Sequence, residues 1–286
     1  MAHQLARRIG VAAIGIPATI GLIYLGGWAL VAALAVLGAL GAFEFYRLAA
    51  RHGVRALVAL GCGGAALFPA GAWLVLPAGY ALAPRWFAFL LALWLMGVMG
   101  AALATRAPVD GPTAGLGVTV LGALYAGALP AFLLLLRYPA SPPGAVAGTA
   151  LACFPLALTW ICDTLAMAGG AVIGGPKLAP VLSPAKTWAG ALTGTVGALL
   201  GAFAYGRWVL APLEVALSVP VLLGSGAAVA TLGQLGDVAE SLFKREAGAK
   251  DSGALFPGHG GVLDRLDSLY WTIPAVALVV LAGGGL

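Results

Sequence analysis

The stretch from Ser241 to Asp267 concentrates charged residues and glycines in a chain that is otherwise largely apolar. It contains four of the fifteen Lys and Arg residues, four of the ten acidic residues, and His259. Carboxylates suit hard divalent cations, and Lys and Arg bind phosphate oxygens. Glycines such as Gly260 and Gly261 break a helix and let backbone N–H groups approach a ligand closely. This composition fits a site for a polyphosphate bound with a divalent metal, and it fits equally a solvated loop whose charges pair with one another.

Polar residues before and within this stretch recur at helical spacing. Steps of three, four and three residues place one set on a single helical face: Gln234, Asp237, Ser241 and Lys244. Asp264 and Asp267 are three residues apart, so on one helix their carboxylates would share a face and could bind one metal or a close pair. Asp237 could supply a further ligand from the preceding helix. We therefore predict that Asp237, Asp264 and Asp267 bind Mg²⁺ or another divalent cation, with Asp251 and Asp163 as second choices.

A second polar region lies further upstream. Asp163 follows an apolar run, where a lone carboxylate costs a few kcal/mol unless it is paired or hydrated. It marks a polar cavity or a helix–helix contact, and we favour the cavity. Ser183 followed by Pro184 has the form of an N-cap with proline at the first helical position, which predicts a helix with Lys186 and Thr187 in its first turn. Such a helix N-terminus can bind an anion, and the alternative is simple capping beside a cytoplasmic lysine.

The charged stretch resembles the signature of the phosphatidate cytidylyltransferases, also called CDP-diacylglycerol synthases. The fixed places of that signature are filled by Ser241, Lys244, Arg245, Lys250, Asp251, Gly253, Pro257, His259, Gly260, Gly261, Asp264, Arg265 and Asp267. The upstream region resembles a second block of the same family through Asp163, Thr164, Ala166, Lys177, Leu178, Pro180, Ser183, Pro184, Lys186, Thr187 and Gly190. The chain departs from the pattern at Ala189, where the family has Glu, so any role of that carboxylate does not carry over.

The resemblance implies an enzyme that transfers a cytidylyl group from CTP to phosphatidate, giving CDP-diacylglycerol and pyrophosphate in phospholipid biosynthesis. Catalytic roles are expected for Asp237, Lys250, Asp251, His259 and Arg265. Substrate-binding roles are expected for Asp163, Ser183, Lys186, Thr187, Ser241, Lys244 and Arg245. The expected partners are CTP, phosphatidate and bilayer lipid, without nucleic acid, and a homodimer is a further expectation.

Two alternative functions stay open at this point. A CTP-dependent kinase acting on a polyprenol, or a cytidylyltransferase acting on another membrane lipid, would use a similar triphosphate site. A transporter would place charges near the bilayer midplane, often in two repeated halves of the chain. Here eight of the ten acidic residues lie from Asp163 to Asp267, in the second half of the chain, which argues against a transporter.

The elements that must position these residues are predicted to be membrane helices. The chain is 62% hydrophobic and 9% charged, whereas a soluble domain carries about 25% charged residues. Apolar runs predict nine spans, at 9–25, 28–46, 56–77, 86–104, 114–136, 147–168, 188–206, 217–236 and 268–285. Pro130 interrupts the fifth span, which could be kinked.

A stripe of small residues on the seventh span predicts tight helix packing, with a dimer face as the alternative: Gly190, Gly194, Gly197 and Gly201. We predict an all-α, polytopic integral membrane protein.

Lys and Arg placement predicts the orientation of these spans. With the N-terminus in the cytoplasm, twelve of the fifteen Lys and Arg residues lie inside, and the C-terminus lies outside. We expect the protein to lie in the inner (plasma) membrane with its active site facing the cytoplasm. We expect residues 1–140 to form an N-terminal scaffold and residues 141–286 to form the catalytic region, with the signature at 241–267. Glu44, beside Arg47 at the end of the second span, is interpreted as half of an interfacial ion pair without a catalytic role.

Overall fold

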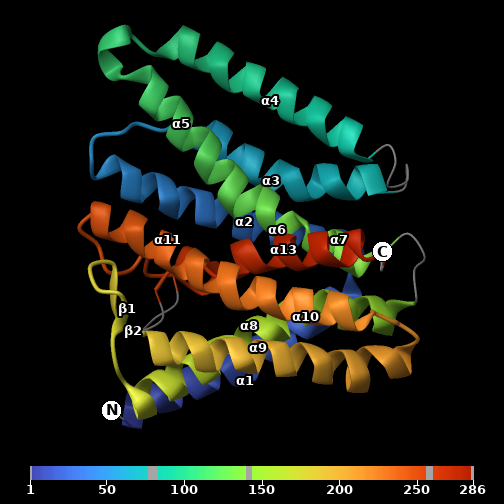
Figure 1. The fold of residues 1–286 in the computed structure, drawn as a ribbon. Coiled ribbons are helices and arrows are strands. Elements are labelled where there is room, and N and C mark those ends of the chain that lie inside the picture. The colour runs from blue at the N-terminus through green and yellow to red at the C-terminus, as the bar shows by residue number, and fades with distance from the viewer. Residues whose placement is uncertain (1, 77–82, 140–143, 256–259, 285–286) are drawn as a thin grey trace. The chain divides into compact units, whose positions relative to one another are not determined.

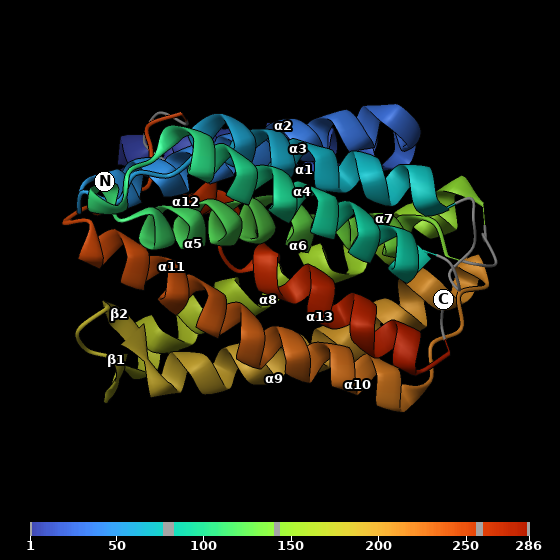
Figure 2. The same ribbon diagram turned by 90° about the horizontal axis from the view of Figure 1, so that it is seen from above.

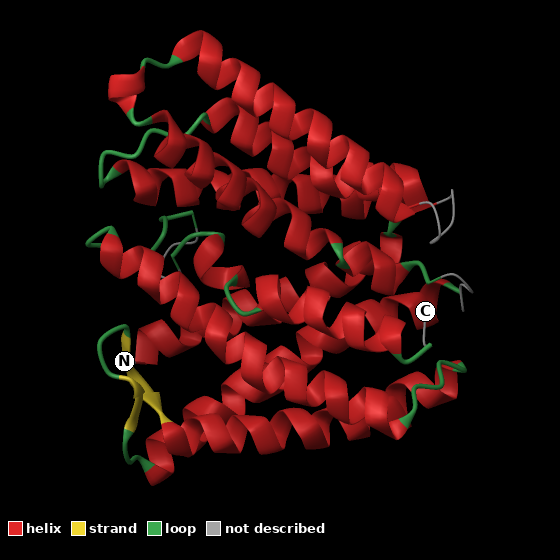
Figure 3. Cartoon of the chain, turned by 45° about the horizontal axis from the view of Figure 1, so that its top comes forward, coloured by secondary structure: helices red, strands yellow, loops and turns green. Residues whose placement is uncertain are grey.

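A computed structural model describes the chain over residues 2–76, 83–139, 144–255 and 260–284. Within these ranges, eight helical segments are long and apolar enough to cross a membrane, and Ala13–Leu25 is a shorter apolar helical segment. Helices dominate the fold, and one short two-stranded hairpin accompanies them (Figure 3). The predicted all-α, multi-pass membrane architecture is confirmed. The shorter segment takes the place of the first of the nine predicted spans.

The chain divides into two compact units. The first unit comprises Met1–Leu134 and Phe243–Arg265, and therefore contains most of the signature stretch. Its elements, labelled in Figure 1, are α1 (Ala2–Leu25), α2 (Gly27–Ala50), α3 (Val58–Val75), α4 (Ala83–Thr105), α5 (Pro112–Ala123), α6 (Leu129–Ala131), the end of α11 (Gln234–Glu246) and most of α12 (Leu263–Leu266). A π-helical turn at Leu124–Ala128 and a break before α7 (Leu133–Arg137) interrupt the predicted fifth span, so the irregularity expected near Pro130 is confirmed.

Aromatic side chains near the end of α2 organise the core of the first unit. The buried Tyr46 donates a 2.7 Å hydrogen bond to the backbone oxygen of Thr119, and the hydroxyl of Thr119 accepts a 2.8 Å bond from the backbone N–H of Leu57. Phe45 packs edge-to-face on Phe243, with ring centroids 5.1 Å apart. These contacts hold the last turn of α11 against α2, and so fix where the signature stretch begins.

The second unit comprises Leu135–Leu242 and Leu266–Leu286. It contains α8 (Ala145–Ile173), β1 (Lys177–Ala179), β2 (Ser183–Thr187), α9 (Trp188–Tyr205), α10 (Val219–Ala228), the first part of α11, and α13 (Leu269–Ala282). In the view of Figure 2, the β1–β2 hairpin lies at one end of α8 and α9. A π-helical turn at Val229–Gly233 leads from α10 into α11.

Small residues allow α8 and α9 to pack closely, as the glycine stripe predicts. Gly190, Gly194 and Gly197 are buried. A Cβ atom on Gly194 would lie 2.9 Å from the Cβ of Ala166 and 3.0 Å from the carbonyl oxygen of Cys162, both on α8. The interpretation of the stripe as a helix-packing face within the chain is confirmed.

The predicted helix start at Ser183 and Pro184 is wrong, although the predicted span at 188–206 agrees with α9. Ser183 and Pro184 lie in β2, which pairs antiparallel with β1, and α9 begins only at Trp188. Thr187 is the N-cap, because its side-chain oxygen accepts a 3.1 Å hydrogen bond from the backbone N–H of Gly190. The local Ser-Pro pattern matches a helix start, but the pairing of the two strands gives this segment an extended backbone instead.

Candidate active site

The carboxylate of Asp264 is the centre of a buried polar network in the first unit. Its Oδ1 lies 2.7 Å from the Nζ of Lys244. Its Oδ2 accepts 2.8 Å hydrogen bonds from the backbone N–H and the hydroxyl of Ser252 and from the backbone N–H of Gly261. The side chains of Lys244 and Asp264 are only 12% and 7% exposed. The network therefore ties the end of α11 to both sides of the signature loop, by which we mean its described residues 247–255 and 260–262.

The sequence after α11 explains how this network forms. Gly248 has φ of 59°, a left-handed conformation that ends helices readily in glycine. The chain then turns back, and the N–H of Ala249 donates a 2.8 Å bond to the carbonyl oxygen of Lys244. Arg245 closes the turn from the side, since its Nη1 donates a 3.0 Å bond to the carbonyl oxygen of Ala249. Lys244, in the last turn of α11, thereby faces the loop.

Glu44 joins the same network, so its interpretation as an interfacial partner of Arg47 is wrong. Glu44 is 6% exposed and accepts hydrogen bonds from the Ser252 hydroxyl and the backbone N–H groups of Val262 and Leu263. Arg47 is exposed, with its guanidinium 6.0 Å from the ring centroid of Phe43. A carboxylate in an apolar helix requires such partners. The argument that flagged Asp163 from the sequence would have identified Glu44 as well.

Two glycines of the loop fit around Glu44 and a third around Asp264. A Cβ atom on Gly253 or on Gly261 would overlap the carboxylate of Glu44, and one on Gly260 would overlap that of Asp264. The close approach expected of these glycines is thus an approach to the protein's own carboxylates. The N–H groups of Gly261, Val262 and Leu263 are already hydrogen-bonded to these two acids.

The remaining predicted residues of the loop and of the helix turns beside it lie at the surface. Arg245, Lys250, Asp251 and Arg265 are exposed. His259 lies outside the described residues, so its predicted role stays a prediction. The backbone N–H groups of Ser252, Gly261, Val262 and Leu263 are bonded to the two acids. The exposed cationic side chains are therefore the better candidates for phosphate binding here.

A second charged cluster lies in the other unit. Lys186 of β2 forms a 2.7 Å ion pair with Asp237 of α11, and its Nζ lies 3.3 Å from the carbonyl oxygen of Gln234. The two side chains are 22% and 35% exposed, so solvent reaches the pair. Asp163 of α8 is within electrostatic range of both Asp237 and Lys186. Three residues that the sequence predicts to act together are therefore neighbours.

The other predicted residues of the second unit lie in its strand, its helices and the turn between α12 and α13. Thr187 is 6% exposed and caps α9, Ser183 lies in β2, and Ser241 is buried in α11. Asp267 lies between α12 and α13, and its Oδ1 accepts a 2.7 Å bond from the N–H of Ser268. The single helical turn expected to present Asp264 and Asp267 together is thus interrupted after Leu266.

Parts of the charged clusters fit a divalent cation. Within each unit, the described residues hold no group of three His, Cys, Asp or Glu side chains arranged for a metal. Mg²⁺ commonly binds proteins through one or two carboxylates and takes its other ligands from water and substrate phosphates. Asp163 and Asp237 supply two such carboxylates within electrostatic range of each other. Both oxygens of Asp264, in contrast, already accept hydrogen bonds from protein donors.

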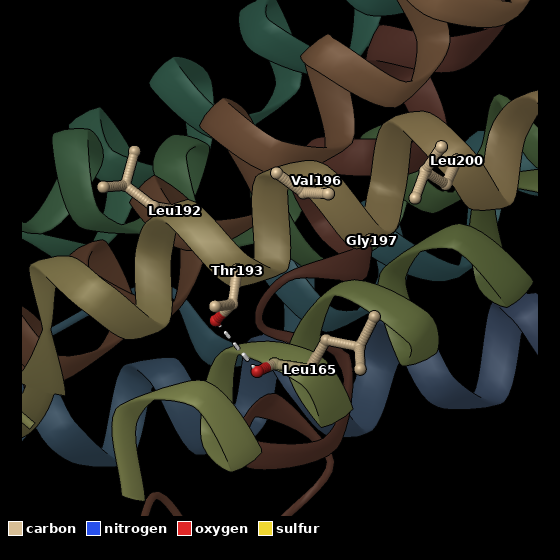
Figure 4. Close-up of a pocket in the computed structure, with 6 residues that line it drawn as sticks. All are labelled: Leu165, Leu192, Thr193, Val196, Gly197 and Leu200. Carbon is tan, nitrogen blue, oxygen red and sulfur yellow. Dashed lines mark hydrogen bonds between the residues drawn. The ribbon is translucent and has the colours of Figure 1, made fainter. Parts of the chain in front are cut away.

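An apolar cavity of about 320 Å³ lies between α8 and α9 in the second unit (Figure 4). Its lining is Leu165, Leu192, Thr193, Val196, Gly197 and Leu200. The hydroxyl of Thr193, the polar side chain in this lining, donates a 3.1 Å bond to the carbonyl oxygen of Leu165 (Figure 4). The cavity therefore suits a hydrocarbon chain rather than a triphosphate.

The chain is similar in sequence to known cytidylyltransferases. The model of the cytidylyltransferase family matches residues 6–282. A phosphatidate cytidylyltransferase of Brucella abortus biovar 1 (strain 9-941) is 46% identical over 130 residues, which are 46% of this chain and 45% of that protein. Proteins of the same name from Haemophilus influenzae and Staphylococcus aureus (strain COL) are 40% identical over 127 residues and 39% over 124. These two matches cover 44% and 43% of this chain and 44% and 46% of those proteins. Each match thus spans less than half of the relative's length.

Proposed function

The chain belongs to the cytidylyltransferase family, and from this premise we propose that it transfers the cytidylyl group of CTP to phosphatidate. The products are CDP-diacylglycerol and pyrophosphate. The family match over residues 6–282 carries the proposal, and the names of the curated relatives support the choice of phosphatidate.

The chemistry needs no covalent bond to the protein. A phosphate oxygen of phosphatidate attacks the α-phosphorus of CTP, forming a new phosphoanhydride bond. The bond from the α-phosphorus to the oxygen that bridges to the β-phosphorus breaks, and pyrophosphate leaves with that electron pair. Catalysis then consists of holding two anionic substrates in line and stabilising negative charge on the phosphate oxygens.

The exposed cations of the signature loop suit the triphosphate. Lys250 lies at the surface of the loop, Arg245 precedes the loop in the last turn of α11, and Arg265 follows it on α12. Lys186 brings a further cation to Asp163 and Asp237 in the second unit. Asp163 and Asp237 would hold Mg²⁺, with Asp267 as a further candidate. When bound, the cation would neutralise charge on phosphate oxygens.

The protein is a multi-pass membrane protein, and we place it in the inner (plasma) membrane with its charged clusters facing the cytoplasm. The excess of Lys and Arg on one side of the predicted spans supports this orientation. CTP is available on that side, and phosphatidate reaches the enzyme from the bilayer.

Pyrophosphate release tests the proposal. The purified protein in detergent with CTP and Mg²⁺ should release pyrophosphate only when phosphatidate is added. Diacylglycerol or a polyprenol in place of phosphatidate should give none. Release that is independent of phosphatidate, or that requires a neutral lipid alcohol, would contradict the proposed substrate.

A further inference from the structure

We propose that Glu44 is a positioning residue, whose carboxylate anchors the signature loop in the arrangement that nucleotidyl transfer requires. The loop's anchoring follows from contacts alone, while its catalytic consequence rests on the proposed function. Glu44 lies in α2, more than 200 residues before the loop, and belongs to neither of the charged blocks of the sequence.

Three donors converge on this carboxylate. Its Oε2 lies 2.9 Å from the Ser252 hydroxyl and 3.0 Å from the backbone N–H of Leu263, and its Oε1 lies 3.1 Å from the backbone N–H of Val262. Val262 and Leu263 are 0% and 1% exposed, so water does not replace a lost partner without the loop moving. The Glu44 side chain therefore binds the chain both before and after residues 256–259.

Ser252 links this anchor to the residues expected to meet substrate. Its hydroxyl lies 2.9 Å from Glu44 and 2.8 Å from Oδ2 of Asp264, and its single proton can serve only one of them at a time. Ser252 directly follows Lys250 and Asp251 in the chain. A shift of Ser252 would thus move the exposed lysine and the carboxylate beside it.

The glycines give a second, independent sign of the same role. A methyl group on Gly261 would overlap both carboxylate oxygens of Glu44. Gly261 does not have a left-handed φ, so alanine is strained there by Glu44 and not by its own backbone. Gly260 provides the contrast, since its φ is +79° and its methyl group would meet Asp264.

Cysteine labelling tests the anchor without reference to activity. Val262→Cys is introduced after Cys62, Cys153 and Cys162 are replaced by alanine, and the rate of reaction with a water-soluble maleimide is measured in detergent. With Glu44 present the thiol should be protected, and Glu44→Ala should raise the rate at least tenfold in protein that remains monodisperse. Arg47→Gln, on the same helix but exposed, should leave the rate unchanged. An unchanged rate in Glu44→Ala would overturn the proposal.

A double-mutant cycle tests the catalytic consequence. Glu44→Ala and Gly261→Ala should each lower kcat/KM for CTP at least tenfold, whereas Arg47→Gln should stay within twofold of wild type. The double variant should be no worse than Glu44→Ala alone, because the space left by the carboxylate admits the methyl group. Additive losses, or a Glu44→Ala variant with wild-type kinetics, would overturn the positioning role. A wild-type protein without transferase activity would refute the proposed function instead, and labelling would still decide the anchor.

Discussion

Lys244 and Asp264 form an ion pair with 2.7 Å between Nζ and Oδ1, and both side chains are largely buried. The pair connects the last turn of α11 with the first turn of α12, and Ser252 and Gly261 complete the hydrogen bonding of the carboxylate. The arrangement gives Asp264 a structural role, because its carboxylate joins the two helix turns and the loop.

Breaking this pair should destabilise the protein. Asp264→Asn leaves the Lys244 ammonium buried opposite an uncharged amide, and removing one partner of a buried pair costs about 3–5 kcal/mol. We expect a lower unfolding midpoint in detergent and a loss of turnover. Lys250→Met, at an exposed position of the same loop, should keep the midpoint while raising the KM for CTP. Equal midpoints for Asp264→Asn and wild type would contradict the structural role of the pair.

Asp237 should be required for the response to divalent cations. Loss of a metal ligand removes several kcal/mol of charge stabilisation, so Asp237→Asn should reduce turnover at least about 100-fold. Asp267→Asn tests the further predicted ligand in the same way. The measurement is the rate as a function of Mg²⁺ concentration, with Asp110→Asn, an exposed acid of the short 3-10 helix Pro108–Asp110, as the matched control. Near-normal turnover of Asp237→Asn at saturating Mg²⁺ would refute its assignment as a ligand.

Thr187 should stabilise the start of α9. Its side-chain oxygen caps the N–H of Gly190, and loss of an N-cap costs about 1 kcal/mol. Thr187→Ala should therefore lower the unfolding midpoint, while Thr187→Ser should restore most of it. Ser183→Ala, in β2, should have a smaller effect. A larger drop in the unfolding midpoint for Ser183→Ala than for Thr187→Ala would indicate that Ser183, and not Thr187, is the N-cap.

The orientation of the spans predicts an extracytoplasmic C-terminus. A reporter that is active only in the cytoplasm, fused after Leu286, should give no signal in an otherwise active protein. The same reporter fused after Gly248, in the signature loop, should be active. A strong signal from the C-terminal fusion would exclude nine spans with a cytoplasmic N-terminus.

Long apolar runs made the helices predictable, because each such segment must satisfy its backbone hydrogen bonds internally in lipid. Asp163, Lys186 and Asp237 could each be selected from the sequence as candidate site residues, but their proximity is seen only in the structure. Glu44 could not be assigned to the loop in the same way, since its partners are Ser252, Val262 and Leu263, over 200 residues away in the chain. Their contact depends on tertiary packing within the first unit, such as that of Phe243 against Phe45, which local sequence does not encode.

The hairpin escaped prediction for a related reason. Ser183 and Pro184 satisfy a helix-start pattern over a few residues, whereas β2 forms through pairing with β1, as in the match of Lys177 with Thr187. The strand places Lys186 next to Asp237, so the lysine lies beside another predicted site residue although the expected helix is not formed there.

The position of the label that enters lipid tests the central claim most directly. Purified protein is supplied with phosphatidate and with CTP labelled at either the α- or the γ-phosphate, and the lipid fraction is separated and counted. Cytidylyl transfer predicts lipid labelled from the α-position and none from the γ-position, with the γ-label recovered in pyrophosphate. Lipid labelled only from the γ-position would contradict the account and identify a CTP-dependent kinase.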